Sequence, residues 1–267
     1  MRSAKRGRLR CTSHRDIARA LERALRRAQV PMAYSAGFSP HPKISWVGAA
    51  PTGVASEAEY VELGLAVAVD VERLRADLDA SLPPGIDVLE VVEAPTGTSL
   101  PDRIVASHWR VRLPGVGDER AAAAVRAFLA EESVVVERLT KNGRRPLDAR
   151  AAVVRLAVLG GGVDDAPDEA SITHGDQRCA TLDMVVRHVT PAVRPDDVLS
   201  GLRSVADLVP PVPPEATRLA QGPLTGPDEV GDPLAPDRDA APSALGPTRQ
   251  DAVPVGRDSA AGAQPPG

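Results

Sequence analysis

The sequence predicts an α+β fold made of two ferredoxin-like (βαββαβ-type) halves in tandem, followed by a disordered C-terminal tail. Residues 1–94 show the order strand, helix, strand, strand, helix, strand, which is that of the ferredoxin-like split unit. A related α+β pattern begins again at residue 103 and continues to residue 209. Beyond residue 209 the chain holds thirteen of its 26 prolines and little apolar periodicity, so this segment is not expected to bury a core.

Local signals place each element of the first half. Ser13 is expected to cap a basic helix over residues 14–29, with Asp16 at the position that a capping box gives to an acid. Gly and Pro residues predict a loop over 34–42, because they break any regular period. The remaining expected elements are strands at 7–12, 43–49, 57–67 and 86–93, a turn at 51–53, and a helix at 70–81.

The second half follows a short linker at 94–102. Its expected elements are strands at 103–113, 133–140, 149–159 and 178–189, helices at 118–131 and 195–204, and an irregular loop at 160–177. Residues 210–267 are interpreted as a Pro-rich acidic tail that is mostly disordered from about 222.

Charge is distributed very unevenly along the chain. The formal net charge is −4, yet residues 1–50 carry eleven Lys or Arg against two Asp or Glu, while residues 205–267 carry four against nine. No apolar run reaches the length of a membrane span, and no apolar segment follows the basic N-terminus as in a secretory signal. Cys11 and Cys179 match no metal-ligand spacing and are interpreted as reduced, buried thiols, with a disulfide between them as the alternative. We therefore expect a cytoplasmic protein without a membrane partner.

Arginines on the 14–29 helix form the first candidate site. Arg15, Arg19, Arg23 and Arg26 lie about one turn apart on the face opposite the apolar residues, where they could meet the phosphates of a nucleic acid. The alternative is a solvated face in an arginine-rich protein. Only two acidic residues of the helix itself are available to neutralise this charge.

The loop from Tyr34 to Lys43 is the second candidate site. Tyr34 and Phe38, with the nearby Trp46, offer ring faces on which unpaired bases could stack. The candidate acid–base residues of the chain are also here or nearby: His41, Tyr34, Lys43 and His14. The alternative is that the rings pack the loop onto the sheet and the histidines make local hydrogen bonds.

Other polar segments carry weaker signals. Asn142-Gly143 predicts a turn whose neighbours Lys141, Arg144 and Arg145 could extend a polyanion-binding surface. His174, Asp176 and His188 lack metal-ligand spacing. Nucleophile elbows, zinc motifs and dinucleotide fingerprints are absent from the sequence.

Several short motifs together resemble a known family. They are Gly7-Arg8-Leu9-Arg10, Ser13-His14-Arg15-Asp16, Arg23-Ala24-Leu25-Arg26-Arg27-Ala28, the run from Tyr34 to Ser45, Pro51-Thr52-Gly53-Val54 with Ser56, and Glu59-Tyr60. This pattern is similar to the radical SAM-associated domain of unknown function, which occurs fused to, or encoded beside, a radical SAM protein with a cobalamin-binding domain. The match is dense over 7–95, and weaker echoes extend to about residue 220.

The resemblance implies an accessory role for this chain. Radical SAM enzymes hold an iron–sulfur cluster through a CxxxCxxC motif, which this sequence lacks. The chain looks like the stand-alone form, and the iron–sulfur cluster, S-adenosylmethionine and cobalamin are expected only on a separately encoded radical SAM partner. The layout is also distantly similar to CRISPR repeat-processing endonucleases, which cleave RNA without metal on tandem ferredoxin-like folds.

Three hypotheses follow. The first is an accessory module, without catalytic activity of its own, that presents a structured RNA to the radical SAM partner. The second is a metal-independent ribonuclease that uses His14 or His41 with Tyr34 and Lys43, and the third is a protein-binding scaffold. The expected nucleic-acid-binding residues are Arg8, Arg10, Arg15, Arg19, Arg23, Arg26, Tyr34, Phe38, His41 and Lys43.

Overall fold

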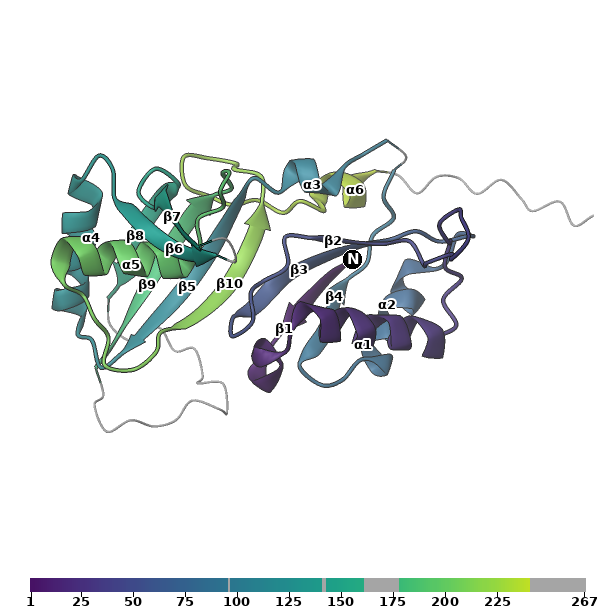
Figure 1. Cartoon of the computed structure of the whole chain (residues 1–267). Coiled ribbons are helices and arrows are strands. Elements are labelled where there is room, and N and C mark those ends of the chain that lie inside the picture. The colour runs from purple at the N-terminus through teal and green to yellow at the C-terminus, as the bar shows by residue number, and fades with distance from the viewer. Residues whose placement is uncertain (96, 141–142, 161–177, 241–267) are drawn as a thin grey trace, which may run out of the picture.

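The computed structural model describes residues 1–95, 97–140, 143–160 and 178–240, and shows a mixed α+β protein with one large sheet (Figure 1). The strands of the described residues are β1 (Arg2–Lys5), β2 (Ile44–Val47), β3 (Ala55–Leu63), β4 (Ile86–Glu90), β5 (Ala106–Pro114), β6 (Val135–Thr140), β7 (Gly143–Asp148), β8 (Val153–Leu159), β9 (Cys179–Arg187) and β10 (Glu215–Gly222). The helices are the 3₁₀ helix η1 (Gly7–Cys11), α1 (His14–Arg27), α2 (Val71–Ser81), α3 (Leu100–Arg103), α4 (Asp118–Ala130), α5 (Pro195–Ala206) and α6 (Ala235–Asp239).

The first half places four strands in the order β4-β1-β3-β2, and all neighbours run antiparallel. Helices α1 and α2 cover one face of these strands. Leu21 and Leu25 of α1 and Leu78 of α2 are buried there against Val61 of β3. On the other face, Leu100 of α3 and Leu234 pack against Tyr60 and Val47 in a smaller apolar cluster. Burial on both faces makes this sheet the rigid base for the segments at its edge.

The second half repeats this strand order. When the separate β6–β7 hairpin is set aside, its fourth, first, third and second strands lie in the order β10-β5-β9-β8, again antiparallel. Helices α4 and α5 cover one face, where Phe128 and Leu202 are buried against Val111 and Leu182. The two apolar cores are separate, so each half has its own interior.

One short parallel contact joins the two halves into a single sheet. Strand β3 pairs with β2 through Tyr60–Leu63, but with β10 only through Ala55 and Ser56, which face Thr217 and Arg218. Figure 1 shows β10 running between β5 and β3 at the centre of the molecule. Because the shared ladder is only two residue pairs long, other contacts must hold the halves together.

The structure corrects the expectation for the start of the chain. Residues 7–12 were predicted to be a strand, but 7–11 form η1, and the first strand is Arg2–Lys5. Gly7 has φ of +54°, which breaks an extended run at this point. The true strand was not predicted because its buried residues include Ser3 and Lys5, which give no apolar alternation.

The predicted tail is also corrected. Residues 215–222 form β10 in the middle of the sheet, and the chain continues as an ordered segment to α6, where Asp237 accepts hydrogen bonds from Arg103 at 2.8 and 2.9 Å. Strand β10 escaped prediction because its inward-facing residues include Arg218 and Gln221, which are polar yet almost fully buried. The tail beyond 240, the interior of the expected loop at 160–177, and Lys141-Asn142 of the expected turn lie outside the described residues.

The cysteine expectation holds only in part. Both thiols are free, but Cys11 is exposed and Cys179 is half-buried, so neither is the buried thiol that was expected. None of the helices in the described ranges has the length and apolar character that crossing a membrane requires.

Candidate nucleic-acid interface

Helix α1 is positioned by its cap and its apolar stripe. The Ser13 side chain accepts a hydrogen bond from the Asp16 backbone N–H at 3.2 Å, and its hydroxyl donates to the Asp16 carboxylate at 2.7 Å. Ile17, Leu21 and Leu25 are buried against the sheet. The opposite face is therefore held toward solvent, and its arginines are exposed: Arg15, Arg19, Arg23, Arg26 and Arg27.

Local acids neutralise only part of this charge. Arg19 lies 3.8 Å from Asp16, and Arg26 lies 3.8 Å from Glu22, both as exposed pairs on the same helix. Such pairs contribute roughly 0.3–0.5 kcal/mol and release a side chain easily. Within the described residues, Arg15 makes no ion pair. The helix thus offers cations that an anionic ligand can bind at little cost.

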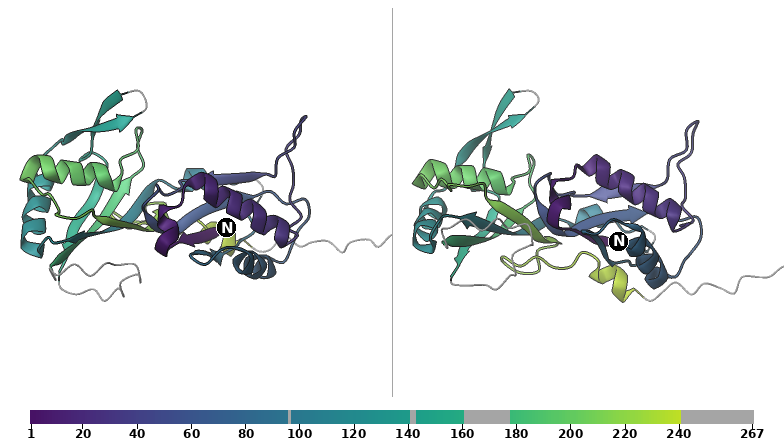
Figure 2. Two further views of the ribbon diagram at one scale, coloured as in Figure 1. Left: turned by 60° about the horizontal axis from the view of Figure 1, so that its bottom comes forward. Right: turned by 90° about the horizontal axis from the view of Figure 1, so that it is seen from below.

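The segment between α1 and β2 forms a narrow arm, here defined as residues 32–43. Figure 2 shows it projecting from the body in both views. Tyr34 bridges to Pro42, the Ser35 N–H donates to the His41 carbonyl at 2.9 Å, and the His41 N–H donates to Ser35 Oγ at 3.0 Å. Gly37 turns the tip with φ of +128°, and Phe38 beside it is fully exposed. The predicted loop is therefore an extended, hydrogen-bonded arm with an aromatic tip.

A groove of about 730 Å³ runs between α1 and the base of the arm. The helix contributes Glu22 and Arg26, the segment just after it contributes Gln29, and the arm contributes Tyr34 and His41. Trp46 of β2 also lines the groove, and its ring meets the ring of His14 edge-on with centroids 4.9 Å apart. The walls thus combine aromatic faces, hydrogen-bonding groups and one cation.

Several predicted site residues come together at this groove. Arg26, Tyr34 and His41 line it directly. Arg15 and Arg19 precede Arg26 by eleven and seven residues, which are close to whole numbers of helical turns, so the three side chains lie on one face of α1. Because Arg26 lines the groove, this row of arginines runs along its edge. We call Arg15, Arg19 and Arg26 the arginine stripe.

Other predicted residues lie elsewhere. Arg23 is further round the helix, and Phe38 is at the tip of the arm. Lys43 does not line the groove; its backbone N–H donates to Ala33, and its side chain packs beside Gly64. Arg8 and Arg10 are on η1, at the other end of α1, where Arg10 lies 4.0 Å from Glu215 of β10.

The candidate acid–base residues are not linked to one another. Within the described residues, no hydrogen bond joins the side chains of His14, Tyr34, His41 and Lys43. No cluster of three or more His, Cys, Asp or Glu in the described ranges has the arrangement of a metal site.

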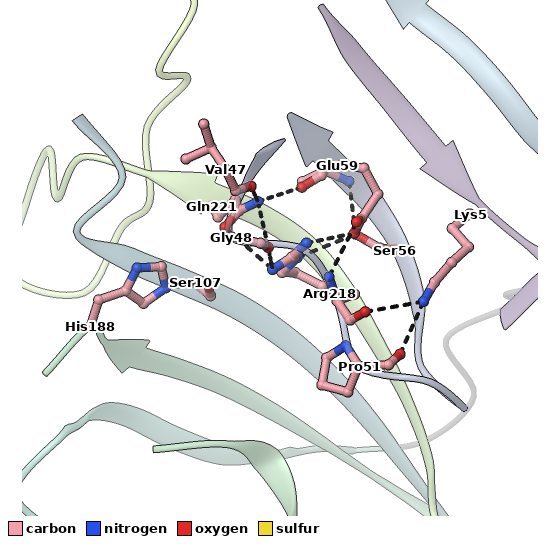
Figure 3. A network of polar contacts seen from close by, with 12 residues as sticks. Lys5, Val47, Gly48, Pro51, Ser56, Glu59, Ser107, His188, Arg218 and Gln221 are labelled. Atoms are coloured by element: carbon pink, nitrogen blue, oxygen red, sulfur yellow. Dashed lines mark hydrogen bonds and ion pairs between the residues drawn. The ribbon is translucent and has the colours of Figure 1, made fainter. Parts of the chain in front are cut away.

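A buried polar network lies at the junction of the halves (Figure 3). Arg218 of β10 is 3% exposed, and its guanidinium donates to Glu59 Oε1 at 2.5 Å, to the Gly48 carbonyl at 2.5 Å and to Ser56 Oγ at 3.2 Å. The guanidinium also lies 5.6 Å from the ring centroid of Trp109. Burial lowers the pKa of Arg218, and the carboxylate of Glu59 opposes that shift.

Two further side chains complete this network. Gln221 Nε2 donates to the Ala58 carbonyl at 2.7 Å and to the Gly48 carbonyl at 3.3 Å, where β2 leaves β3 and β10 takes its place. Lys5 Nζ donates to the Pro51 carbonyl at 3.0 Å, and burial lowers the pKa of Lys5. We call Lys5, Ser56, Glu59, Arg218 and Gln221 the junction network. It fixes the end of β2, the strand that carries Trp46.

Sequence reasoning missed the role of the junction network. Ser56 and Glu59 belong to the motifs quoted for the family resemblance, but no function was assigned to them. Arg218 and Gln221 fell in the predicted tail. A carboxylate and a guanidinium 159 residues apart in sequence give no local signal that they are partners.

Two other polar clusters lie in the second half. His108 contacts Asp183 at 2.5 Å, and Asp183 also pairs with Arg155 at 2.6 Å, which ties β5, β9 and β8 together. His188, left unassigned by its spacing, places Nδ1 3.0 Å from the Ile104 carbonyl and Nε2 2.6 Å from Ser107 Oγ. Partial burial of the imidazole lowers the pKa of His188, although the residue as a whole is exposed.

Comparison with known proteins identifies one matching family. The model of the family described as "Uncharacterized protein conserved in bacteria (DUF2344)" matches residues 1–195. The matched region includes the arginine stripe, the arm and the groove. No curated protein matches the chain.

Proposed function

The chain belongs to this bacterial DUF2344 family, and we propose that it is an RNA-binding accessory protein. The groove beside α1 would hold part of a structured RNA and present it to a separate radical SAM enzyme that modifies the RNA. In this proposal the chain itself catalyses no reaction. The iron–sulfur cluster, S-adenosylmethionine and cobalamin would all belong to the partner.

One observation carries the RNA-binding part of the proposal: the arginine stripe flanks a groove whose walls contain aromatic rings. Arg15, Arg19 and Arg26 cover roughly 16 Å along the helix axis, given a rise of about 1.5 Å per residue. Guanidinium groups in such a row can meet successive phosphates of a strand, while Tyr34 and Trp46 offer faces for its bases. Cations alone would bind many polyanions; the adjacent rings favour a nucleic acid.

The partner part of the proposal rests on the resemblance of the motifs between Gly7 and Tyr60. We also infer that the two halves are variants of the ferredoxin-like unit, since both have the strand order fourth, first, third, second. A fold of this kind does not define a function, so the argument depends on the groove.

The test is a fluorescence-anisotropy titration of the full chain with labelled tRNA and rRNA fragments in EDTA, at about 50 and about 200 mM salt. Three phosphate contacts should give a slope of log K against log[salt] near −2, because each contact to a single strand contributes about −0.7. Binding that is absent, or that does not depend on salt, would refute the RNA-binding proposal. Gel analysis of the same samples tests the ribonuclease hypothesis, which requires cleavage that is lost in His41→Ala.

The partner is tested separately. Tagged full-length chain should retain a co-expressed radical SAM protein after nuclease treatment if the two proteins touch directly. Loss of the partner on nuclease treatment would mean that RNA bridges them. Failure to co-purify before that treatment would refute the partnership.

A further inference from the structure

We propose that the RNA is bound as an unpaired loop, with one base inside the groove and a neighbouring base stacked on Phe38 at the tip of the arm. This inference rests on the proposed RNA-binding function. It specifies that the bound RNA is unpaired, because a fully paired duplex cannot make these contacts.

The size of the groove gives the first argument. About 730 Å³ lies within the range of roughly 300–1,000 Å³ that is typical of pockets for single small molecules. A nucleotide fits such a space, whereas a double helix does not. The bases of paired RNA lie stacked inside the helix, and the deep major groove of A-form RNA does not admit side chains. Contact with Tyr34 and Trp46 inside the groove therefore requires a base that has left its stack.

The chemistry of the groove gives the second argument. Glu22 and Gln29 line it with a carboxylate and an amide, and His41 adds a ring nitrogen. These groups can form hydrogen bonds with the edge of a base, which is accessible only when the base is unpaired. Arg26 lies on the same wall and belongs to the arginine stripe, so the base and its phosphate would be bound side by side.

Phe38 gives the third argument. Its side chain is fully exposed, and in the described residues no other aromatic ring is as open to solvent. An exposed phenylalanine forgoes about 1.5–3 kcal/mol that burial would provide, so contact with a ligand that covers the ring would be favourable. Stacking on an unpaired base provides that cover and contributes roughly 1–3 kcal/mol.

The arm is built to hold Phe38 ready for such a contact. The Tyr34–Pro42 bridge and the reciprocal bonds between Ser35 and His41 keep its two strands together. Pro40 and Pro42 stiffen the returning strand. Because the arm is ordered before binding, little conformational entropy is lost when a base stacks on its tip. A flexible loop would not present an aromatic ring in this way.

The experiment compares two labelled RNAs of equal length and charge in an anisotropy titration at one salt concentration. One is a hairpin with a loop of about eight unpaired nucleotides, and the other is a continuous duplex. The full chain should bind the hairpin at least about tenfold more tightly, because stacking on one base contributes roughly 1–3 kcal/mol. Phe38→Ala should weaken binding to the hairpin by about tenfold and leave binding to the duplex unchanged.

The β6–β7 hairpin supplies a matched control. Leu139 is 79% exposed on it, so Leu139→Ala removes a solvent-exposed apolar side chain elsewhere and should change neither affinity. Thermal melting of both variants checks that they remain folded. Equal affinity for hairpin and duplex, or a Phe38→Ala variant that binds the hairpin like wild type, would overturn the inference while RNA binding stands. Absence of binding to both RNAs would instead overturn the proposed function.

Discussion

The two halves of this protein share a strand order but differ in the helix that follows their first strand. Helix α1 and helix α4 occupy equivalent positions, and each buries an apolar stripe against its own part of the sheet. Yet α1 contains five arginines, whereas α4 contains two and begins with Asp118 and Glu119. Since α4 packs without such charge, the fold does not require the arginines of α1. The arginines of α1 are therefore available to bind a ligand, as the proposed function requires.

The insertions of the two halves differ in the same way. In each half a hairpin-like segment separates the first helix from the second strand: the arm in one, β6–β7 in the other. The base of β6–β7 is tied to the body by Val136 and Leu147 in the core and by the Arg138–Asp197 ion pair. Each segment leaves two large apolar side chains exposed: Val135 and Leu139 on β6–β7, and the aromatic Tyr34 and Phe38 on the arm. In the proposed function, the aromatic rings of the arm distinguish the surface of the first half from that of the second.

The largest expected effect is the loss of stability when the junction network between the halves is broken. Arg218→Met leaves the Glu59 carboxylate buried without its partner and should lower the free energy of unfolding by about 3–5 kcal/mol, measured by urea denaturation. Arg238→Met is the matched control, because it breaks exposed pairs with Glu90 and Asp232 and should cost less than about 1 kcal/mol. If both variants lose the same stability, the junction network does not hold the halves together.

The second effect tests whether charge distinguishes the halves. Arg15, Arg19 and Arg26, all changed to Gln, should weaken RNA binding by about 10²-fold and make its salt slope shallower by about 2. The matched triple variant changes three exposed arginines of the second half, Arg126, Arg187 and Arg203, to Gln. Both variants lose the same net charge, so equal weakening would mean that only overall charge matters.

The third effect concerns the close approach of β2 to β10. A Cβ at position 48 would lie 2.6 Å from Gln221 Oε1, and Gly48 has φ of +58°, so Gly48→Ala should cost about 2 kcal/mol of stability. Gly53→Ala, at φ of +89° with open space around it, should show only the backbone cost of about 1 kcal/mol. Denaturation midpoints of the two variants separate the clash from the strain. Equal midpoints would show that Gln221 moves aside freely.

The smallest expected effect is a pH dependence located in the second half. Because the pKa of His188 is lowered in the folded state, its imidazole is protonated less readily there than in the unfolded chain. The unfolded chain then binds more protons below its pKa of about 6.5, so stability should fall as the pH is lowered from about 7.5 to about 5.5. His188→Gln removes this proton uptake, and its melting temperature should change less over that range. Parallel curves for the variant and wild type would contradict the assignment.

The sequence alone was enough for the elements whose information is local. Helical periodicity together with the Ser13 cap predicted α1, and similar patterns predicted α2, α4 and α5 to within a few residues. The row of arginines followed from spacing along one helix. Their position beside Tyr34, His41 and Trp46 did not follow from it, because the groove depends on how the base of the arm is placed next to α1.

Tertiary structure decided the parts whose stability comes from distant partners. Two of the strands that sequence reasoning missed or placed in a tail, β1 and β10, send polar side chains into the interior: Lys5 from one, Arg218 and Gln221 from the other. Apolar alternation cannot reveal such strands, since burying a charge is favourable only once its partners are in place. Those partners, Glu59 and the carbonyls of Gly48 and Pro51, come from separate segments of the chain. The sequence therefore determined the four longer helices α1, α2, α4 and α5, and where positive charge lies along the chain. The assembled sheet alone decided how the halves are joined.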